Sequence, residues 1–159
     1  MKIDYFLALE DYLHNSLSEF SDVLKAFPKK RVGSITIEEL CSIYEYPNGF
    51  YLFFDDEDNL LFIGKAASRS FIEMIPANFD QREEAWFNAL PKKLMKDESL
   101  ENFRDALNQS LLFRLVLVGV KDQPNISKVV KVLRSYMQPL YNPRKEEHLS
   151  TDLLERFVD

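Results

Sequence analysis

The chain has 159 residues, 46% of them hydrophobic and 13% aromatic, which is enough for one sizeable core and short for two. Its formal net charge is −6, and an acidic chain does not attract a polyanion over its whole surface. The single cysteine, Cys41, excludes an intramolecular disulfide, and two widely separated histidines, His14 and His148, argue against a Cys/His zinc site. No apolar run approaches a membrane span, and the N-terminus lacks the apolar block of a signal peptide. We therefore expect a cytoplasmic protein with no membrane partner.

The charged residues are unevenly distributed along the chain. Residues 49–145 hold 14 basic and 13 acidic side chains, whereas residues 1–48 hold 5 and 8, and residues 146–159 hold 1 and 5. A locally basic groove is therefore compatible with the middle segment, although the overall composition argues against a nucleic-acid partner.

An apolar stripe marks the N-terminal part of the chain. Apolar residues recur every three or four positions over residues 6–24, which predicts one helix of roughly six turns that ends before Pro28. Thr36 and Glu39 have the spacing of a capping box and predict a short second helix. We expect residues 1–46 to form a helical extension packed on the rest of the chain.

Two short apolar runs then predict a β-hairpin. Residues 50–54 and 60–63 flank the polar stretch 55–59, which is the length of a five-residue hairpin loop. This acidic loop superficially resembles a metal-binding loop. It lacks a glycine at a ligand-loop position, so we interpret it as a solvated turn.

Five further helices and one strand are predicted after the hairpin. Helical spacing and helix-breaking residues place the helices at 68–75, 81–90, 98–107, 125–137 and 152–158, the fourth beginning at Asn125 or Ser127. A nearly continuous apolar run at 112–118 predicts a strand covered on both faces. We expect the only tryptophan, Trp86, to pack in the core. These elements predict one α+β domain.

The hairpin also carries a pair of short motifs. They are Gly49-Phe50-Tyr51 in its first strand and Phe62-Ile63-Gly64 in its second, followed by Lys65 and Arg69, while Pro139-Leu140-Tyr141-Asn142 closes the last long helix. With these motifs at this spacing, the chain resembles the GIY-YIG endonuclease domain over about residues 47–144. The resemblance implies a small three-stranded antiparallel sheet flanked by helices. Residues 1–46 would be an extra N-terminal helical extension, and residues 145–159 an acidic tail with a short helix.

The resemblance also implies an active site. The family's first-motif tyrosine is assigned to activate water and corresponds to Tyr51, and the arginine that contacts the scissile phosphate corresponds to Arg69. A planar guanidinium suits two phosphate oxygens at once. Lys65 would add a positive charge at the same rim. Each residue alone fits an ordinary strand or helix surface, but together in this register they are the predicted catalytic residues.

Two departures from the family pattern argue against catalysis. Phe62 stands where the second motif has a tyrosine, and the family's metal-binding glutamate, counted back from Pro139, falls on Val130 in a helix without carboxylates. Valine offers no oxygen to Mg²⁺, and without the ion a tyrosine is an inefficient base at neutral pH. We therefore expect no resident metal ion. Glu73 is the carboxylate that could replace the missing ligand, although pairing with Arg69 is its simpler interpretation.

Candidate nucleic-acid contacts lie on the last long helix and just after it. Lys128, Lys131 and Arg134 repeat every three residues and form a basic stripe, for which a solvated helix face is the simpler interpretation. With Asn142 of the closing motif, they are the predicted nucleic-acid-binding residues.

Three functions stay open from the sequence. We predict a GIY-YIG-like protein with a degenerate site, a non-cleaving module that binds DNA or RNA weakly, or else a protein. One alternative is an active, Mg²⁺-dependent endonuclease with a relocated carboxylate ligand. The other is a protein-interaction subunit that binds its partner through the N-terminal helix and has no nucleic-acid role. The sequence therefore leaves open whether the protein is an enzyme.

Overall fold

A mixed β-sheet forms the centre of the molecule, which we describe from a computed structural model covering residues 2–145 and 149–158. His148 and part of the predicted acidic tail lie outside the described residues. The strands are β1 (Phe6–Ala8), β2 (Lys30–Arg31), β3 (Gly49–Phe54), β4 (Leu60–Ala66) and β5 (Arg114–Gly119). Their order is β1-β5-β3-β4, and β2 pairs with β5 beside β1. β3 is antiparallel to both β4 and β5, whereas β1 runs parallel to β5.

The α+β class is confirmed, but the prediction of a small three-stranded antiparallel sheet is wrong. Residues 1–46 contribute β1 and β2 to the same sheet, which makes it five-stranded and mixed. The predicted strand at 112–118 is β5, which lies between β3 on one side and β1 and β2 on the other. The predicted hairpin is present as β3 and β4, with residues 55–59 as its loop.

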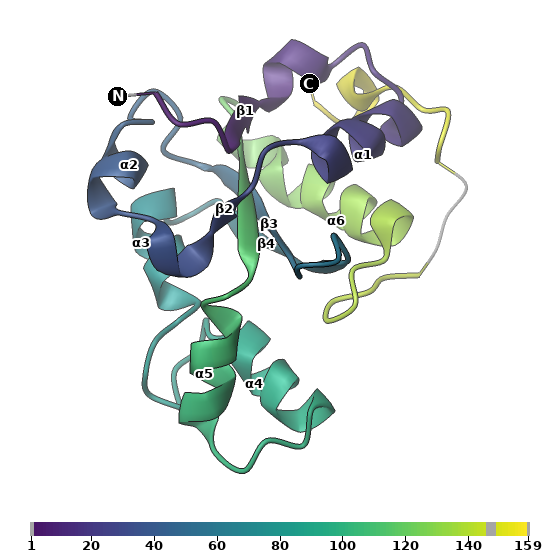
Figure 1. Ribbon diagram of the computed structural model, residues 1–159. Helices are drawn as coiled ribbons and strands as arrows, with labels where there is room; N and C mark the ends of the chain where they lie inside the picture. Colours follow the sequence, from purple (N-terminus) through teal and green to yellow (C-terminus); the bar gives the residue numbers. More distant parts are fainter. Residues whose placement is uncertain (1, 146–148, 159) are drawn as a thin grey trace.

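Six α-helices surround the sheet in the described part of the chain. They are α1 (Leu17–Ala26), α2 (Ile37–Cys41), α3 (Phe71–Ala77), α4 (Ala89–Asp97), α5 (Phe103–Ser110) and α6 (Ile126–Met137). Short 3₁₀ turns occur at Leu9–Tyr12, Val32–Ser34, Gln123–Asn125 and Leu154–Phe157. Figure 1 shows α1 and α6 on one side of the sheet, α2 and α3 on the other, and the α4–α5 pair projecting from the body. None of these helices is both long and apolar enough to cross a membrane.

The predicted six-turn N-terminal helix is wrong. Phe6–Ala8 is a strand, a 3₁₀ turn follows, and α1 begins only after Ser16, whose side chain accepts a hydrogen bond from the Glu19 backbone N–H at 3.1 Å. The residues at helical spacing are buried or half-buried, but Tyr5 to Leu9 is also a continuous apolar run that suits a strand covered on both faces. Residues 6–8 form a strand and not a helix because they pair with β5.

Three other helices begin later than predicted, and the first of them is α3, which starts at Phe71 and not at residue 68. Residues 81–88 form no helix, and α4 starts at Ala89 with Pro91 in its first turn, where a missing backbone N–H costs little. α5 starts at Phe103, because Asn102 caps it by accepting from the Asp105 backbone N–H at 2.9 Å. The predicted last helix at 152–158 is a single 3₁₀ turn.

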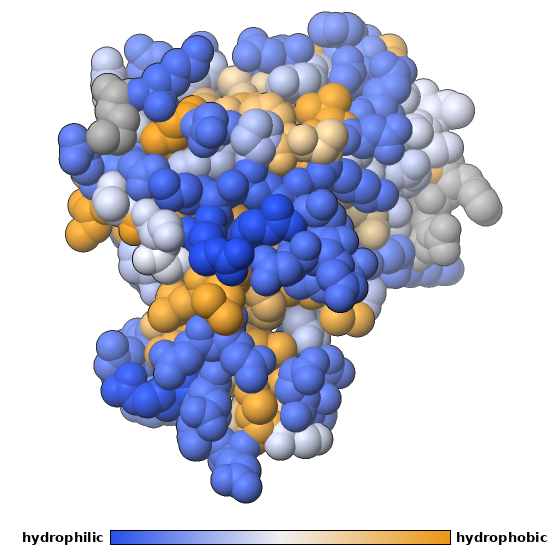
Figure 2. Space-filling view, viewed as in Figure 1, coloured by the Kyte–Doolittle hydropathy of each residue, from blue (hydrophilic) through white to orange (hydrophobic). Residues whose placement is uncertain are grey.

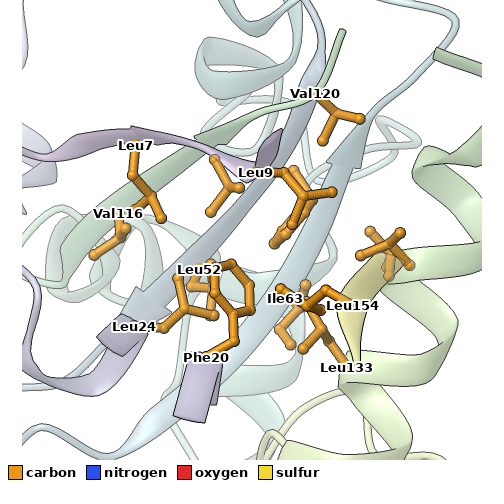
Figure 3. Close-up of a cluster of buried hydrophobic side chains, with 14 of the residues drawn as sticks. Leu7, Leu9, Phe20, Leu24, Leu52, Ile63, Val116, Val120, Leu133 and Leu154 are labelled. Carbon is orange, nitrogen blue, oxygen red and sulfur yellow. The ribbon is translucent and has the colours of Figure 1, made fainter. Parts of the chain in front are cut away.

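Side chains alternate between two apolar cores on the two faces of the sheet. Phe50, Leu52 and Phe54 point into a core completed by α1, α6 and the C-terminal turn, in which Phe20, Leu24, Leu133 and Leu154 pack (Figure 3). Tyr51 and Phe53 point to the opposite face, where α2 and α3 cover them. The strand period of two therefore separates Tyr51 from the core that holds α6.

Candidate functional site

Tyr51 occupies the floor of a hollow beside β4. It lies opposite Gly64 in the β3–β4 register, and its ring crosses that glycine. A Cβ at Gly64 would stand 2.3 Å from the Tyr51 ring, so the second motif needs glycine for packing alone. Packing also requires glycine at position 49, because a Cβ there would stand 1.9 Å from the Val118 carbonyl oxygen. Both motif glycines are therefore required by close packing, and Gly64 makes room for the Tyr51 ring.

The Tyr51 hydroxyl is buried and hydrogen-bonded. The side chain is 2% exposed, and its hydroxyl oxygen accepts from Asn78 Nδ2 at 2.8 Å. Burial raises the pKa of Tyr51 to about 12, although Asn78 and the nearby charge of Arg134 oppose the rise. A tyrosine in this state keeps its proton at neutral pH. It is therefore suited to donating a hydrogen bond and poorly suited to activating water.

Asn78 supplies a second polar group to the same floor. Its Nδ2 also donates to the Met74 carbonyl oxygen at 2.7 Å, whereas its buried Oδ1 has no hydrogen-bond partner among the described residues. Unpaired buried oxygens are uncommon in folded proteins and are costly in the absence of a partner. Asn78 therefore holds the Tyr51 hydroxyl in place and keeps one buried amide oxygen without a partner among the described residues.

Three cationic side chains converge on this hollow, which we call the Tyr51 cavity. The cavity has a volume of about 240 Å³ and is lined by Tyr51, Phe62, Gly64, Lys65, Ala67, Ser68, Arg69, Met74, Asn78, Trp86, Phe87, Ala89 and Arg134. None of these lining side chains is a carboxylate. Its electrostatic character is thus positive, although the chain as a whole is acidic.

Each cation reaches the cavity from a different element. Lys65 on β4 donates to Ser127 Oγ at 3.1 Å. Arg69 lies in the loop before α3, with its guanidinium carbon 5.0 Å from the centre of the Phe87 ring. Arg134 on α6 donates to the Ile63 carbonyl oxygen through Nε at 3.0 Å and through a terminal nitrogen at 2.6 Å. Arg134 is held close against β4, whereas Lys65 and Arg69 are exposed.

The predicted basic stripe on α6 is divided in the structure. Arg134 lines the Tyr51 cavity, while Lys128 and Lys131 are exposed and do not line it. Asn142 is also engaged elsewhere, because its Oδ1 accepts from the Ile63 backbone N–H at 3.2 Å and its Nδ2 donates to the Ile63 carbonyl oxygen at 2.5 Å. The backbone N–H groups of Leu140 and Tyr141 also donate to β4, to the carbonyl oxygens of Leu60 and Leu61. Together these contacts cover the free edge of β4. Nucleic-acid contacts by Lys128, Lys131 and Asn142 stay predictions.

Val130 does not face the cavity, contrary to the sequence-based expectation. It is 1% exposed and belongs to the apolar core that α6 shares with α1. Ser127 and Arg134, two turns apart on α6, hydrogen-bond to residues of β4. Val130 and Lys131 lie between them along the helix, one on either side of the direction that Ser127 and Arg134 share. No carboxylate replaces the family's metal ligand at either position.

Glu73 is engaged in capping α3. Its Oε1 accepts from the Ser70 backbone N–H at 3.2 Å and from the Ser70 hydroxyl at 3.0 Å, which completes a capping box. These hydrogen bonds, and to a smaller extent the charge of Arg69, hold the pKa of Glu73 below its usual value. Among the described residues, no three His, Cys, Asp or Glu side chains are grouped as a metal site.

The acidic hairpin loop forms a turn tied to neighbouring cations. The Asp55 carboxylate accepts from the backbone N–H groups of Glu57 and Asn59, both at 2.9 Å, and Arg114 binds Asp58. The interpretation as a turn is confirmed.

Trp86 stands in solvent at the mouth of the cavity, so the prediction that it packs in the core is wrong. It is 91% exposed, and its neighbour Phe87 is 42% exposed. The reason is that residues 81–88 form an irregular loop, so the expected helix face on which Trp86 would have been buried does not exist. Sequence reasoning missed both aromatic residues as candidates for the site.

Comparisons of the chain with protein-family models, curated proteins and solved structures find no significant match. The resemblance to the GIY-YIG endonuclease domain therefore stays a prediction.

Proposed function

We propose that the chain is a nucleic-acid-binding module that holds phosphate groups at the Tyr51 cavity and does not cleave them. The observation that carries the proposal is the convergence of Lys65, Arg69 and Arg134 on one hollow, in which none of the described lining residues is a carboxylate. Phosphate contacts from lysine and arginine supply most of the sequence-independent affinity for nucleic acids. The net charge of −6 argues against attraction of a polyanion by the whole surface. Three cations in one hollow nevertheless make that part of the surface attractive to phosphate groups.

Binding without cleavage follows from what the cavity lacks. Phosphodiester hydrolysis at neutral pH needs an activated water and a group, usually a divalent metal, that stabilises charge on the phosphate and the leaving group. Tyr51 stays protonated, Glu73 caps α3, and α6 offers Arg134 in place of an acidic ligand. The cations can hold a phosphate, but no described residue is placed to activate water.

Replacing Arg69 with alanine should weaken binding and reduce its dependence on salt. Arg69 is exposed beside the cavity, so the variant should stay folded while losing one phosphate contact. The slope of log K against log [salt] should become shallower by about one unit. Fluorescence anisotropy of a labelled oligonucleotide at several salt concentrations measures this slope. Arg104→Ala, on the exposed face of α5, is the matched control, and an equal loss in both variants would contradict a specific role for the cavity.

A second candidate function, protein binding, is favoured by one apolar surface. Ile37, Tyr44 and Ile72 are exposed, and the last two line a hollow between α2 and α3. By contrast, the apolar face of α1 is buried in the core and is not free to bind a partner. Protein binding through α2 and α3 would gain support if oligonucleotides fail to bind at low salt.

A further inference from the structure

The strongest unexplained feature near the site is the exposed pair Trp86 and Phe87. Trp86 is 91% exposed, whereas most other aromatic side chains of the described residues are buried or half-buried. Tryptophan combines a large apolar surface with a flat ring, and leaving it in water forgoes the stabilisation that burial would give. Apolar residues also gather near the junction of the main body and the α4–α5 pair (Figure 2).

The loop that carries Trp86 is held in place by its own hydrogen bonds. Asn88 is buried, and its Nδ2 donates to the carbonyl oxygens of Asp80 and Arg82 at 3.0 and 2.8 Å. Arg82 in turn pairs with the Asp80 carboxylate at 2.8 Å, and Lys92 donates to the Ala85 carbonyl oxygen. The indole is therefore presented by a constrained loop, which lowers the entropic cost of binding a ligand.

Charge divides the surroundings of Trp86 into two sides. On one side, the Tyr51 cavity carries Lys65, Arg69 and Arg134. On the other side, Trp86 and Arg69 line a second hollow together with Glu84 and the Asp80–Arg82 pair. An anionic chain that touches Trp86 is attracted to the side of the Tyr51 cavity. Arg69, whose guanidinium lies over the Phe87 ring, stands next to the exposed aromatic pair.

We propose that Trp86 is a stacking platform for an unpaired base, so that the module binds single-stranded nucleic acid in preference to a duplex. This inference rests on the proposed function. Aromatic rings combined with basic residues are how proteins bind single strands without reading sequence, because every base has a flat face. A base inside a duplex is already stacked on its neighbours and cannot stack on the indole without being extruded. Phosphates flanking the unpaired base would lie on Lys65 and Arg69.

The single tryptophan makes the inference directly measurable, because intrinsic tryptophan fluorescence of the full chain reports Trp86 alone. We expect an oligothymidylate of about twelve nucleotides to quench this fluorescence on binding, and the corresponding oligouridylate to do so too. Trp86→Ala should weaken single-strand binding by about 5- to 150-fold, whereas Trp86→Phe should lose less. A duplex of the same length should bind more weakly and be less affected. Ile37→Ala, another exposed apolar residue, is the control and should change nothing.

The outcomes separate this inference from the proposed function. Anisotropy of a labelled oligonucleotide reports binding independently of Trp86. Salt-sensitive binding without quenching, and with unchanged affinity in Trp86→Ala, would overturn the stacking role and leave the proposed function intact. Equal affinity for duplex and single strand would overturn the preference. An absence of binding at low salt in the wild-type chain would overturn both proposals. Circular dichroism checks that each variant is folded.

Discussion

Val130→Glu should unfold the protein or destabilise it severely at neutral pH, with no rescue by Mg²⁺. Val130 is 1% exposed and belongs to a cluster of buried apolar side chains. Such burial raises the pKa of a carboxyl group by several units, and keeping it protonated at pH 7 costs the folded state about 4 kcal/mol. Urea unfolding followed by circular dichroism measures the loss. Lys131→Glu, the exposed neighbour, should change stability by less than about 0.5 kcal/mol.

The pH dependence of the Val130→Glu variant has a defined sign. The folded-state pKa of the introduced glutamate would lie above its unfolded value. The variant's deficit relative to wild type should therefore be smallest below the unfolded pKa and grow as pH rises through neutrality. A folded Val130→Glu variant whose melting temperature rises with Mg²⁺ would contradict the placement of residue 130 in the core. It would instead support the register implied by the GIY-YIG resemblance, in which position 130 faces the site of Tyr51 and Arg69.

Reversing two charges at the cavity should nearly abolish nucleic-acid binding. Lys65→Glu with Arg69→Glu removes two phosphate contacts and adds two negative charges at the same rim, so we expect an affinity loss of about 100-fold or more at low salt. Both side chains are exposed, so the double variant should stay folded, which circular dichroism checks. Anisotropy titrations with one labelled oligonucleotide measure the change in affinity.

The matched control for the double variant at Lys65 and Arg69 is Lys96→Glu with Arg104→Glu. These residues are exposed on α4 and α5 and line no part of the Tyr51 cavity, yet the change in net charge is the same. If the two double variants lose equal affinity, the effect comes from net charge alone, and the cavity has no special role.

Local sequence signals predicted the elements that local chemistry decides. The β3–β4 hairpin, the buried strand β5, helix α6 and the capping box of α2 all lie where apolar patterning and side-chain caps placed them. The same patterning was wrong where long-range pairing decides. Residues 6–8 fit a helix and a strand equally well, and only the parallel partner β5 selects the strand.

The candidate site was predictable in part. Tyr51, Lys65 and Arg69 follow from the paired motifs, and the structure brings all three to one cavity. Val130 was misplaced because counting along a helix gives the position but not its orientation, and a shift of one residue turns a helix by about 100°. Trp86 was missed because the failure of residues 81–88 to form a helix depends on buried Asn88 binding backbone carbonyl groups within the loop.

The most direct test of binding without cleavage is whether a bound strand is cut in the presence of a metal ion. A labelled single-stranded oligonucleotide is incubated with wild-type protein and Mg²⁺ or Mn²⁺ at low salt, with the bound fraction read by anisotropy and the strand length by denaturing gel. We predict that the strand is bound and remains full-length, because the described residues of the Tyr51 cavity supply cations without a metal ligand or a base. Shortened products that disappear in Arg69→Ala, or the absence of any bound strand, would contradict the account.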